Sequence, residues 1–386
     1  MVNLKFEAKT INSSIIDSLN YIDNKYMNSQ LLKSLRLFRL TQSKLTEETR
    51  KLQFTGGSTY IISLPKRWVD QNKLGKGSVI KLREEEGGLL SIIPSDTAVQ
   101  QRPEEASIKV ASKDTSGAVI REVVSAYLVG YNILHIKGES QKQLSTRQRR
   151  EIKSFSRNML VGTEIVIDTP QELTLQVLLS YPELSVQSAL RRMSIITASM
   201  HRDAIAALKD LDNQHAREVL TTDNEVDRFN LYIVRQLKTA IQNLRIIKEI
   251  GLKTARDCLG YRLVTKSVER TADHAASIAD NILLMKNKLE SETMEKLEKM
   301  SDLAVSMFEN AIEALFRQDY ALAESIVEKT KDINSMEKEA VVSSQKMDVE
   351  DAPYLRLIIE SIRRTAEYAS DIAEVVLNLN VESVIR

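Results

Sequence analysis

The chain has 386 residues, of which 42% are hydrophobic and 28% are charged, and its formal net charge is +1 at pH 7. That length allows about two to four domains, and the composition is typical of a soluble globular protein. The 12 Gly and 6 Pro residues are few for an all-β fold, so we expect long helices. The single Cys258 excludes an internal disulfide and indicates a reducing compartment, so we expect a cytoplasmic protein.

Nothing in the sequence indicates membrane insertion. The first residues, MVNLKFEAKTINSSII, lack the continuous apolar core of a signal peptide. No apolar run approaches the roughly 18 residues that a membrane helix needs. We therefore expect any role at a membrane to depend on a partner protein.

The nearly neutral net charge hides a basic segment between Thr49 and Arg83, in which Asp70 is the one acid. The basic residues of this segment are Arg50, Lys51, Lys66, Arg67, Lys73, Lys76, Lys81 and Arg83. Such a concentration of positive charge in a neutral chain indicates a polyanion as partner. The alternative is a solvated lysine-rich surface.

The N-terminal quarter of the chain divides into three segments. Residues 1–48 are an amphipathic stretch without clear caps, which we interpret as a partly helical N-terminal extension. Residues 49–94 predict two strands, RKLQF and TYIISLP, a short helix, PKRWVDQ, and two more strands, SVIKLR and LLSIIP. About 45 residues bury too little surface for a stable domain, so we predict an intertwined homodimer. Residues 95–104 are polar and predict a linker.

The rest of the chain changes from alternating strands and helices to helices alone. Residues 105–180 predict a small α+β domain, in which Ser145 or Thr146 begins the second helix. Residues 183–386 predict long antiparallel helices, as in a bundle. Within them, AIAALKDLDNQHAREVL aligns with AIEALFRQDYALAESIV, and RTADHAASIADNIL aligns with RTAEYASDIAEVVL. We predict two tandem three-helix bundles, at about 185–290 and 291–380.

Acidic residues form a stripe on one helix of the first bundle. Glu269, Asp273 and Asp280 fall within a sector of about 40°, away from the apolar face. An earlier helix of the same bundle carries Asp223 and Asp227, one turn apart. If the two helices pack side by side, the carboxylates repel one another, and a hard divalent cation such as Mg, Mn, Ca or Fe(II) would relieve that repulsion.

The alternative interpretation of these acids is a solvated surface, which is common in a highly charged chain. The second bundle has Thr330, Asn334, Arg363 and Glu367 at the equivalent positions. We therefore expect any metal site in the first bundle. His274 lies at the edge of the apolar face, and we interpret it as a polar residue of the packing edge rather than a ligand.

The helical half resembles the PhoU family of phosphate-uptake regulators over residues 183–380. The resemblance depends on the tandem three-helix units and on VERTADHAASIADNI at 268–282, which is similar to that family's helix with an acid–Arg–x–x–Asp–His core. The acidic motifs of the family bind metal clusters on the bundle surface. The resemblance therefore implies a divalent or iron-type metal ion held by Asp223, Asp227, Glu269 and Asp273.

Residues 48–94 resemble the AbrB/MazE swapped-hairpin DNA-binding domains through GGSTYIISLPKRWVDQNKLGKGSVIKL. In that fold two chains interleave and present basic residues to DNA, which implies a homodimer through this domain. The candidate DNA-binding residues are Arg50, Lys51, Lys66, Arg67 and Lys73. The alternative is a dimerisation domain that no longer binds DNA.

Together these segments predict a multidomain fold: a small β swapped-hairpin head, a small α+β middle domain and an all-α C-terminal half of two tandem three-helix bundles. The combination resembles an arrangement seen in archaeal regulators. The middle domain matches no such family, and it is a spacer, a second dimer contact or a ligand sensor.

The leading hypothesis is a dimeric transcriptional regulator of phosphate uptake, whose head binds an operator. Its helical body would sense metal or contact a phosphate transporter or its sensor. The second hypothesis is a signalling adaptor that binds the transporter or sensor without touching DNA. The chain has no Gly-x-Ser-x-Gly motif, no P-loop and no His-rich metal motif, so we do not expect an enzyme.

Overall fold

The computed structural model describes residues 48–85, 88–94, 105–179, 184–242, 244–344 and 349–385. The predicted extension, apart from Glu48, and the predicted linker at 95–104 lie outside these ranges. The chain divides into two compact units, Met1–Gln100 and Gln101–Arg386. The finer domain boundaries within each unit stay predictions. None of the described helices is long and apolar enough to cross a bilayer.

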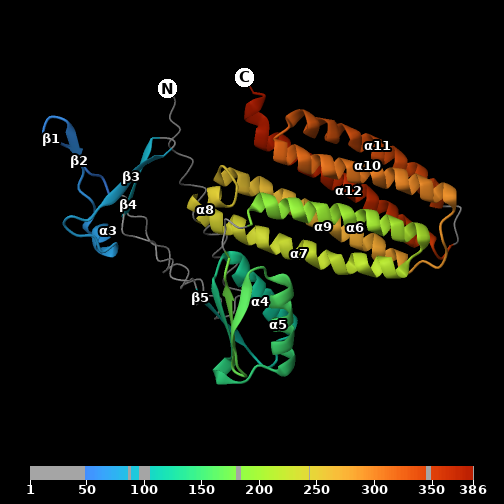
Figure 1. The fold of residues 1–386 in the computed structure, drawn as a ribbon, viewed down its shortest axis with the longest axis horizontal. Helices are drawn as coiled ribbons and strands as arrows, with labels where there is room; N and C mark the ends of the chain where they lie inside the picture. The colour runs from blue at the N-terminus through green and yellow to red at the C-terminus, as the bar shows by residue number, and fades with distance from the viewer. Residues whose placement is uncertain are drawn as a thin grey trace, which may run out of the picture. The chain divides into compact units, whose positions relative to one another are not determined.

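The described part of the first unit, called the head here, consists of two hairpins and a short helix (Figure 1). Strand β1 (Gln53–Thr55) pairs antiparallel with β2 (Thr59–Ile61), and β3 (Ile80–Glu85) pairs antiparallel with β4 (Leu89–Pro94). Helix α3 (Lys66–Gln71) follows Pro65, which has the fixed φ that suits a helix start. Gly56 and Gly57 have φ of 63° and 76°, so they supply the left-handed backbone of the first hairpin turn.

The second unit begins with a small α+β domain, in which helices cover a four-stranded sheet (Figure 1). The sheet has the order β5-β6-β8-β7, with β5 parallel to β6 and the other pairs antiparallel. The strands are β5 (Glu105–Val110), β6 (Ile133–Gly138), β7 (Thr163–Asp168) and β8 (Glu172–Val177), and the helices are α4 (Ser116–Val129), the 3-10 turn η1 (Glu139–Gln141) and α5 (Thr146–Met159).

Side-chain caps set where the two helices of this domain begin. Thr115 accepts a hydrogen bond from the backbone N–H of Ala118 at the start of α4. Ser145 and Gln148 form a capping box at the start of α5, so Ser145 is the cap of the two candidates, Ser145 and Thr146, that the sequence offers. Such caps bind backbone N–H groups that the first turn of a helix leaves free.

The rest of the second unit, called the body here, is the predicted pair of helical bundles (Figure 1). The helices are α6 (Val186–Asp210), α7 (Asn213–Gln242), α8 (Leu244–Glu249), α9 (Ala255–Ile282), α10 (Ser291–Arg317), α11 (Tyr320–Ser344) and α12 (Ala352–Asn380), followed by the 3-10 turn η2 (Val381–Ser383). Helices α6, α7 and α9 pack together, as do α10, α11 and α12. Because α6 packs on α10 and α9 packs on α12, both bundles share one hydrophobic core.

The internal repeat extends to the turn between the first two helices of each bundle. Leu211 ends α6 and Gln318 ends α10, and both are left-handed, with φ of 52° and 57°. The aspartate after each one accepts hydrogen bonds from the first backbone N–H groups of the following helix: Asp212 from Gln214 and His215, and Asp319 from Leu322. The two bundles therefore repeat in detail, as the sequence alignment predicts.

One buried arginine on α7 joins the body to the α+β domain. Arg235 is 1% exposed and donates to the carbonyl oxygens of Gly130 and Tyr131 at 3.1 and 3.0 Å. It also donates to the side-chain oxygen of Asn132 at 2.8 Å and to the carbonyl of Tyr127. These acceptors form the end of α4 and the following turn, where helix carbonyl groups lack partners within the helix. The guanidinium therefore caps α4 from outside the domain.

Candidate functional site

The predicted metal ligands lie on two adjacent helices of the body. Asp223 and Asp227 are on α7, and Glu269 and Asp273 are on α9, and these two helices pack side by side. Asp223, Asp227 and Glu269 are partly buried, and Asp273 is at the exposed rim. The structure thus places all four predicted acids, called the acidic cluster here, on one α7–α9 surface.

Three aspartates of the acidic cluster, Asp223, Asp227 and Asp273, have raised pKa values. Burial, together with the charges of Asp227, Asp273, Glu269 and Asp280, raises the pKa of Asp223 to about 7. Burial and the nearby charge of Glu269 raise the pKa of Asp273 to about 6. The pKa of Asp227 is raised by burial and by Glu269. The protein therefore concentrates negative charge that it does not fully neutralise.

One ammonium group lies inside the acidic cluster. Lys266 forms an ion pair with Glu269, one turn away on α9. Within the described ranges, no three His, Cys, Asp or Glu side chains are arranged to hold a metal ion as placed. Mutual repulsion and the pull of Lys266 on Glu269 give a physical reason why the carboxylates do not converge.

An amide oxygen extends the same surface. Asn230 on α7 has a buried side-chain oxygen without a hydrogen-bond partner among the described residues. It lies three residues after Asp227 and seven after Asp223, so the three residues share one face of the helix. Amide and carboxylate oxygens are both ligands of hard cations. Asn230 therefore adds a further oxygen donor of the kind that hard cations bind to the α7 side of the acidic cluster. It was not among the residues predicted from the sequence, although its spacing from Asp223 was visible.

His274 faces away from the acidic cluster. Its Nδ1 lies 3.2 Å from the hydroxyl oxygen of Ser361 on α12, and its ring centroid is 5.7 Å from that of Tyr368. Burial lowers its pKa. These contacts agree with the interpretation of His274 as a residue of the packing edge between the two bundles.

The predicted DNA-binding residues are all on the surface of the head. Lys66 and Arg67 form the first turn of α3, and Lys73 follows that helix with a φ of 52°. Arg50 and Lys51 precede β1, and Arg50 forms an ion pair with Glu48. All five side chains are exposed. The structure groups three of them around α3 and leaves the other two on the segment that leads into β1.

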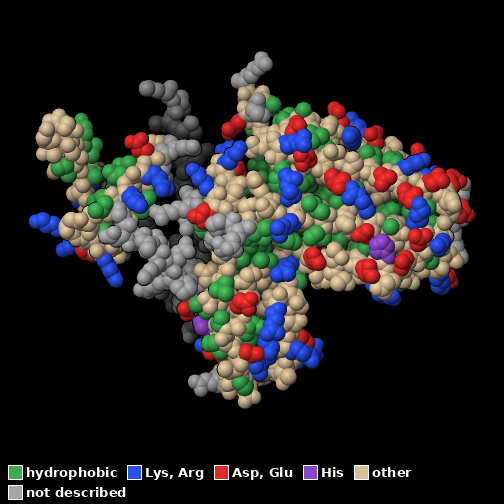
Figure 2. All heavy atoms as spheres, in the orientation of Figure 1, with side chains coloured by type: hydrophobic (Ala, Val, Ile, Leu, Met, Phe, Trp, Pro, Cys, Tyr) green, Lys and Arg blue, Asp and Glu red, His purple; other side chains and the backbone are tan. Residues whose placement is uncertain are grey.

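The head has no hydrophobic core of its own in a single copy. None of its described residues is buried, and large apolar side chains are exposed on its strands and on the segments beside them (Figure 2). These side chains are Leu52, Phe54, Tyr60, Ile61, Ile62, Val79, Leu82, Leu89 and Leu90. Their exposed fractions range from 46% to 69%. Such a set of exposed apolar residues is typical of an interface rather than of a solvent-facing surface.

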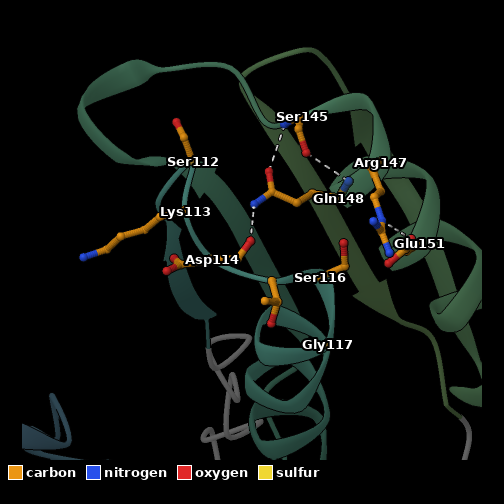
Figure 3. Close-up of a pocket in the computed structure, with 10 residues that line it drawn as sticks. Ser112, Lys113, Asp114, Ser116, Gly117, Ser145, Arg147, Gln148 and Glu151 are labelled. Atoms are coloured by element: carbon orange, nitrogen blue, oxygen red, sulfur yellow. Dashed lines mark hydrogen bonds and ion pairs between the residues drawn. The ribbon is translucent and has the colours of Figure 1, made fainter.

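The α+β domain has a pocket of about 340 Å³ where α4 and α5 begin (Figure 3). Gln148 bridges its two sides by donating to the carbonyl oxygens of Ala111 and Asp114 at 3.3 and 2.9 Å. Arg147 donates to Glu151 at 2.8 Å on the rim. The charged lining residues are Lys113, Arg147, Asp114 and Glu151. The formal charges of these side chains sum to zero.

Known proteins are similar to about half of this chain. The chain is 24% identical over 199 residues to the phosphate-specific transport system accessory protein PhoU homolog 1 of Thermotoga maritima, which covers 50% of this chain and 84% of that protein. It is 25% identical over 191 residues to the phosphate-specific transport system accessory protein PhoU homolog of Borreliella burgdorferi, which covers 46% of this chain and 84% of that protein.

Two solved structures are also similar. The phosphate transport system regulatory protein PhoU of Streptococcus pneumoniae has 20% identity and a TM-score of 0.45, and it covers 52% of this chain and 96% of its own. PhoU of Pseudomonas aeruginosa has 22% identity and a TM-score of 0.45, with the same coverage of 52% and 96%.

Two family models match separate parts of the chain. The PhoU domain matches residues 190–282 and 297–376. The antidote-toxin recognition domain MazE, a bacterial antitoxin, matches residues 53–99. These are the two segments in which the sequence resembles the PhoU and AbrB/MazE families. Two consecutive segments of the chain are therefore similar to PhoU domains, and an earlier segment is similar to a MazE-type domain.

Proposed function

We propose that this protein regulates phosphate uptake as a DNA-binding homodimer. The observation that supports the proposal is the head, which combines exposed apolar side chains with exposed basic ones. The relatives of the body are named as accessory proteins of phosphate-specific transport. The head would carry the regulator to an operator, and the body would carry the phosphate-related signal.

Dimerisation supplies the core that a single head lacks. A second copy of β1–β4 would cover apolar side chains such as Phe54 and Leu82, which are 60% and 62% exposed. Each Å² of apolar surface removed from water contributes about 25 cal/mol. Burying the apolar side chains of both heads therefore strongly favours dimerisation. This agrees with the swapped-hairpin arrangement that the sequence resembles.

DNA binding follows from the charges that the dimer would present. Two copies of Lys66, Arg67 and Lys73 would form a continuous basic surface. Lys and Arg contacts to phosphates release counterions, which makes the affinity fall with salt. Arg67 could also read guanine edges in the major groove.

A gel-shift experiment with the full chain tests this proposal. The probe is the promoter DNA that adjoins the gene of this protein, titrated at several salt concentrations. We expect a salt-dependent shift, which Lys66→Ala/Arg67→Ala weakens. In the proposed dimer this removes four basic side chains, which should lower the salt slope by about 4 if all four contact phosphates. Lys329→Ala/Lys331→Ala, which removes two exposed lysines of α11, is the matched control and should leave the shift unchanged.

The second candidate function is an adaptor that contacts a phosphate transporter or its sensor without binding DNA. The names of the relatives favour it, because they describe accessory proteins of phosphate-specific transport. Absence of any salt-dependent shift with the wild-type protein would favour this second candidate over the first. Neither candidate requires an enzymatic activity.

We also propose that the acidic cluster binds a divalent cation. The likeness to PhoU, the raised pKa values of Asp223 and Asp273 and the buried Asn230 oxygen support this. Bound metal would supply positive charge that relieves the repulsion between α7 and α9. Asp223, Asp227, Glu269 and Asp273, with Asn230, would hold it.

Elemental analysis of purified protein tests the metal site. We expect metal in the wild type and its loss in Asp227→Asn/Asp273→Asn. Glu324→Gln/Glu328→Gln is the control, because it removes two exposed acids of α11 at the same four-residue spacing. Equal metal content in the wild type and the Asp227→Asn/Asp273→Asn protein would refute the site.

A further inference from the structure

The second repeat has an arginine where the acidic cluster of the first repeat has a glutamate. The alignment that pairs RTADHAASIADNIL with RTAEYASDIAEVVL places Arg363 opposite Glu269 and Glu367 opposite Asp273. On the preceding helices, Glu337 of α11 is the counterpart of Asn230 of α7. The equivalent surfaces of the two repeats can therefore be compared residue by residue.

Arg363 lies at the centre of a set of carboxylates. Its Nε is 3.1 Å from a carboxylate oxygen of Glu337 on α11, and its Nη1 donates to Glu367 on α12. Its Nη2 is 4.0 Å from Glu360, one turn earlier on α12. The Arg363 side chain is 20% exposed, which limits the screening of these ion pairs by water.

The charges of the two surfaces are inverted at two positions. The first repeat has Lys266 and Glu269, which form an ion pair, and the second repeat has Glu360 and Arg363 at the equivalent positions. Arg364, with its Nη1 3.0 Å from Glu367, is the counterpart of Arg270 in the first repeat. The second surface therefore has two guanidinium groups among three carboxylates, those of Glu337, Glu360 and Glu367. The first surface has four acids with Lys266 and Arg270.

The position of the Arg363 guanidinium matters as much as its charge. It connects α11 to α12, as a cation held by Asp227, Asn230, Glu269 and Asp273 would connect α7 to α9. A planar guanidinium satisfies carboxylates from two directions at once. The second surface has also lost two carboxylates, because Thr330 and Asn334 replace the aspartates of α7.

We propose that the Arg363 guanidinium is a built-in cation. It occupies in the second repeat the position that a divalent cation would occupy in the first. The inference rests on the proposed metal site of the first repeat. It deepens that proposal, because it makes the body bind metal in one repeat only. The contact between α11 and α12 is then stable without metal, and metal binding stabilises only the contact between α7 and α9.

The first test uses the full chain with Asp223→Asn/Asp227→Asn, which removes carboxylates of the first repeat, and Mn²⁺ as the probe. In this background we expect no bound Mn²⁺ and no rise of the thermal unfolding midpoint on adding Mn²⁺. Adding Arg363→Glu, which restores the residue of the first repeat, should yield about one Mn²⁺ per chain and a midpoint that rises with Mn²⁺. If the background protein still binds Mn²⁺, and Glu337→Gln/Glu367→Gln removes it, the second repeat is an open metal site and the proposal is wrong.

The second test needs no metal and a milder substitution. In the presence of a chelator, Arg363→Gln should lower the unfolding midpoint more than Arg202→Gln does. Arg202 is the matched control, because it pairs with Glu309 at 2.7 Å but is 54% exposed. If Arg363→Gln lowers the unfolding midpoint no more than Arg202→Gln does, Arg363 does not act as the built-in cation of the second repeat. If the proposed metal site of the first repeat is itself wrong, the result is different. Asp223→Asn/Asp227→Asn alone would then leave the metal content unchanged.

Discussion

At the residue scale, the body has a histidine at its centre that the two repeats do not share. His201 is 0% exposed, and its Nε2 and Nδ1 lie 3.0 and 3.3 Å from the hydroxyl oxygens of Ser301 and Thr365. The equivalent residue of the second repeat is Phe308. Burial, helped by the charges of Arg202 and His274, lowers the pKa of His201 to about 4.

We predict that His201 makes the stability of the body depend on pH. Because its pKa is lowered in the folded state, unfolding takes up a proton below about pH 6.5, the ordinary pKa of histidine. Its contribution is therefore complete above pH 6.5, falls as the pH drops, and levels off near pH 4. A shift of this size corresponds to about 3 kcal/mol.

The measurement compares urea unfolding of the wild type and His201→Phe between pH 4 and pH 7. The difference between the two proteins isolates His201, because carboxylates with raised pKa values, such as Asp223, act in the opposite direction in both proteins. We expect the free energy of unfolding of the wild type to fall relative to the variant as the pH decreases. A constant difference across this range would contradict the prediction.

At the element scale, the turns after α6 and α10 use residues with side chains where glycine is the usual choice. Gln318 is exposed and has a φ of 57°, which costs an L-residue about 1 kcal/mol. We predict that Gln318→Gly stabilises the protein by about 1 kcal/mol, measured by urea unfolding. Gln318→Ala keeps the Cβ atom and should give no gain. A destabilised Gln318→Gly protein would disprove this reasoning.

The equivalent change in the first repeat should behave differently. Leu211 has the same left-handed backbone, but its side chain packs against the body core. Leu211→Gly would relieve the backbone and lose apolar contacts together, so its gain should be smaller than that of Gln318→Gly or reversed.

The second prediction at this scale concerns Arg235, which connects α7 to the α+β domain. Arg235→Met removes the donors to Gly130, Tyr131 and Asn132 and leaves these partly buried acceptors without the guanidinium. We expect a loss of about 3 kcal/mol and a separate thermal transition for the α+β domain.

Calorimetry and hydrogen exchange of the turn at 127–132 would measure this effect. Lys238→Met, which changes an exposed residue one turn later on α7, is the control and should leave a single transition. If Arg235→Met also keeps one transition and loses little stability, the α+β domain is held mainly by other contacts.

At the scale of the whole molecule, we predict that assembly depends on the head. The wild-type chain should sediment as a dimer, because a single head leaves its apolar side chains exposed. Phe54→Glu/Leu82→Glu places charges in that surface and should give monomers in analytical ultracentrifugation. Val342→Glu changes an apolar residue of α11 that is 58% exposed, and it should leave the dimer intact. If Val342→Glu gives monomers and Phe54→Glu/Leu82→Glu does not, the dimer contact lies on the body.

Much of the fold was predictable because its signals are local. The cap at Ser145, the hairpin turn at Gly56 and Gly57 and the apolar periodicity of the body all lie within a few residues of the structure they specify. The same holds for the acids of α7 and α9, whose spacing already put them on common helix faces. Asn230 was missed because an isolated asparagine gives no charge signal.

The sequence by itself determined the order of elements, the repeat within the body and the likeness to PhoU and MazE-type domains, since each depends on residues near one another in the chain. Only the tertiary structure decided which side chains meet across helices. It brought Asp223 and Asp227 close to Glu269 and Asp273, aimed Arg235 into the α+β domain and surrounded Arg363 with carboxylates of α11 and α12. Such meetings depend on the packing of whole helices, in which a small rotation changes every contact.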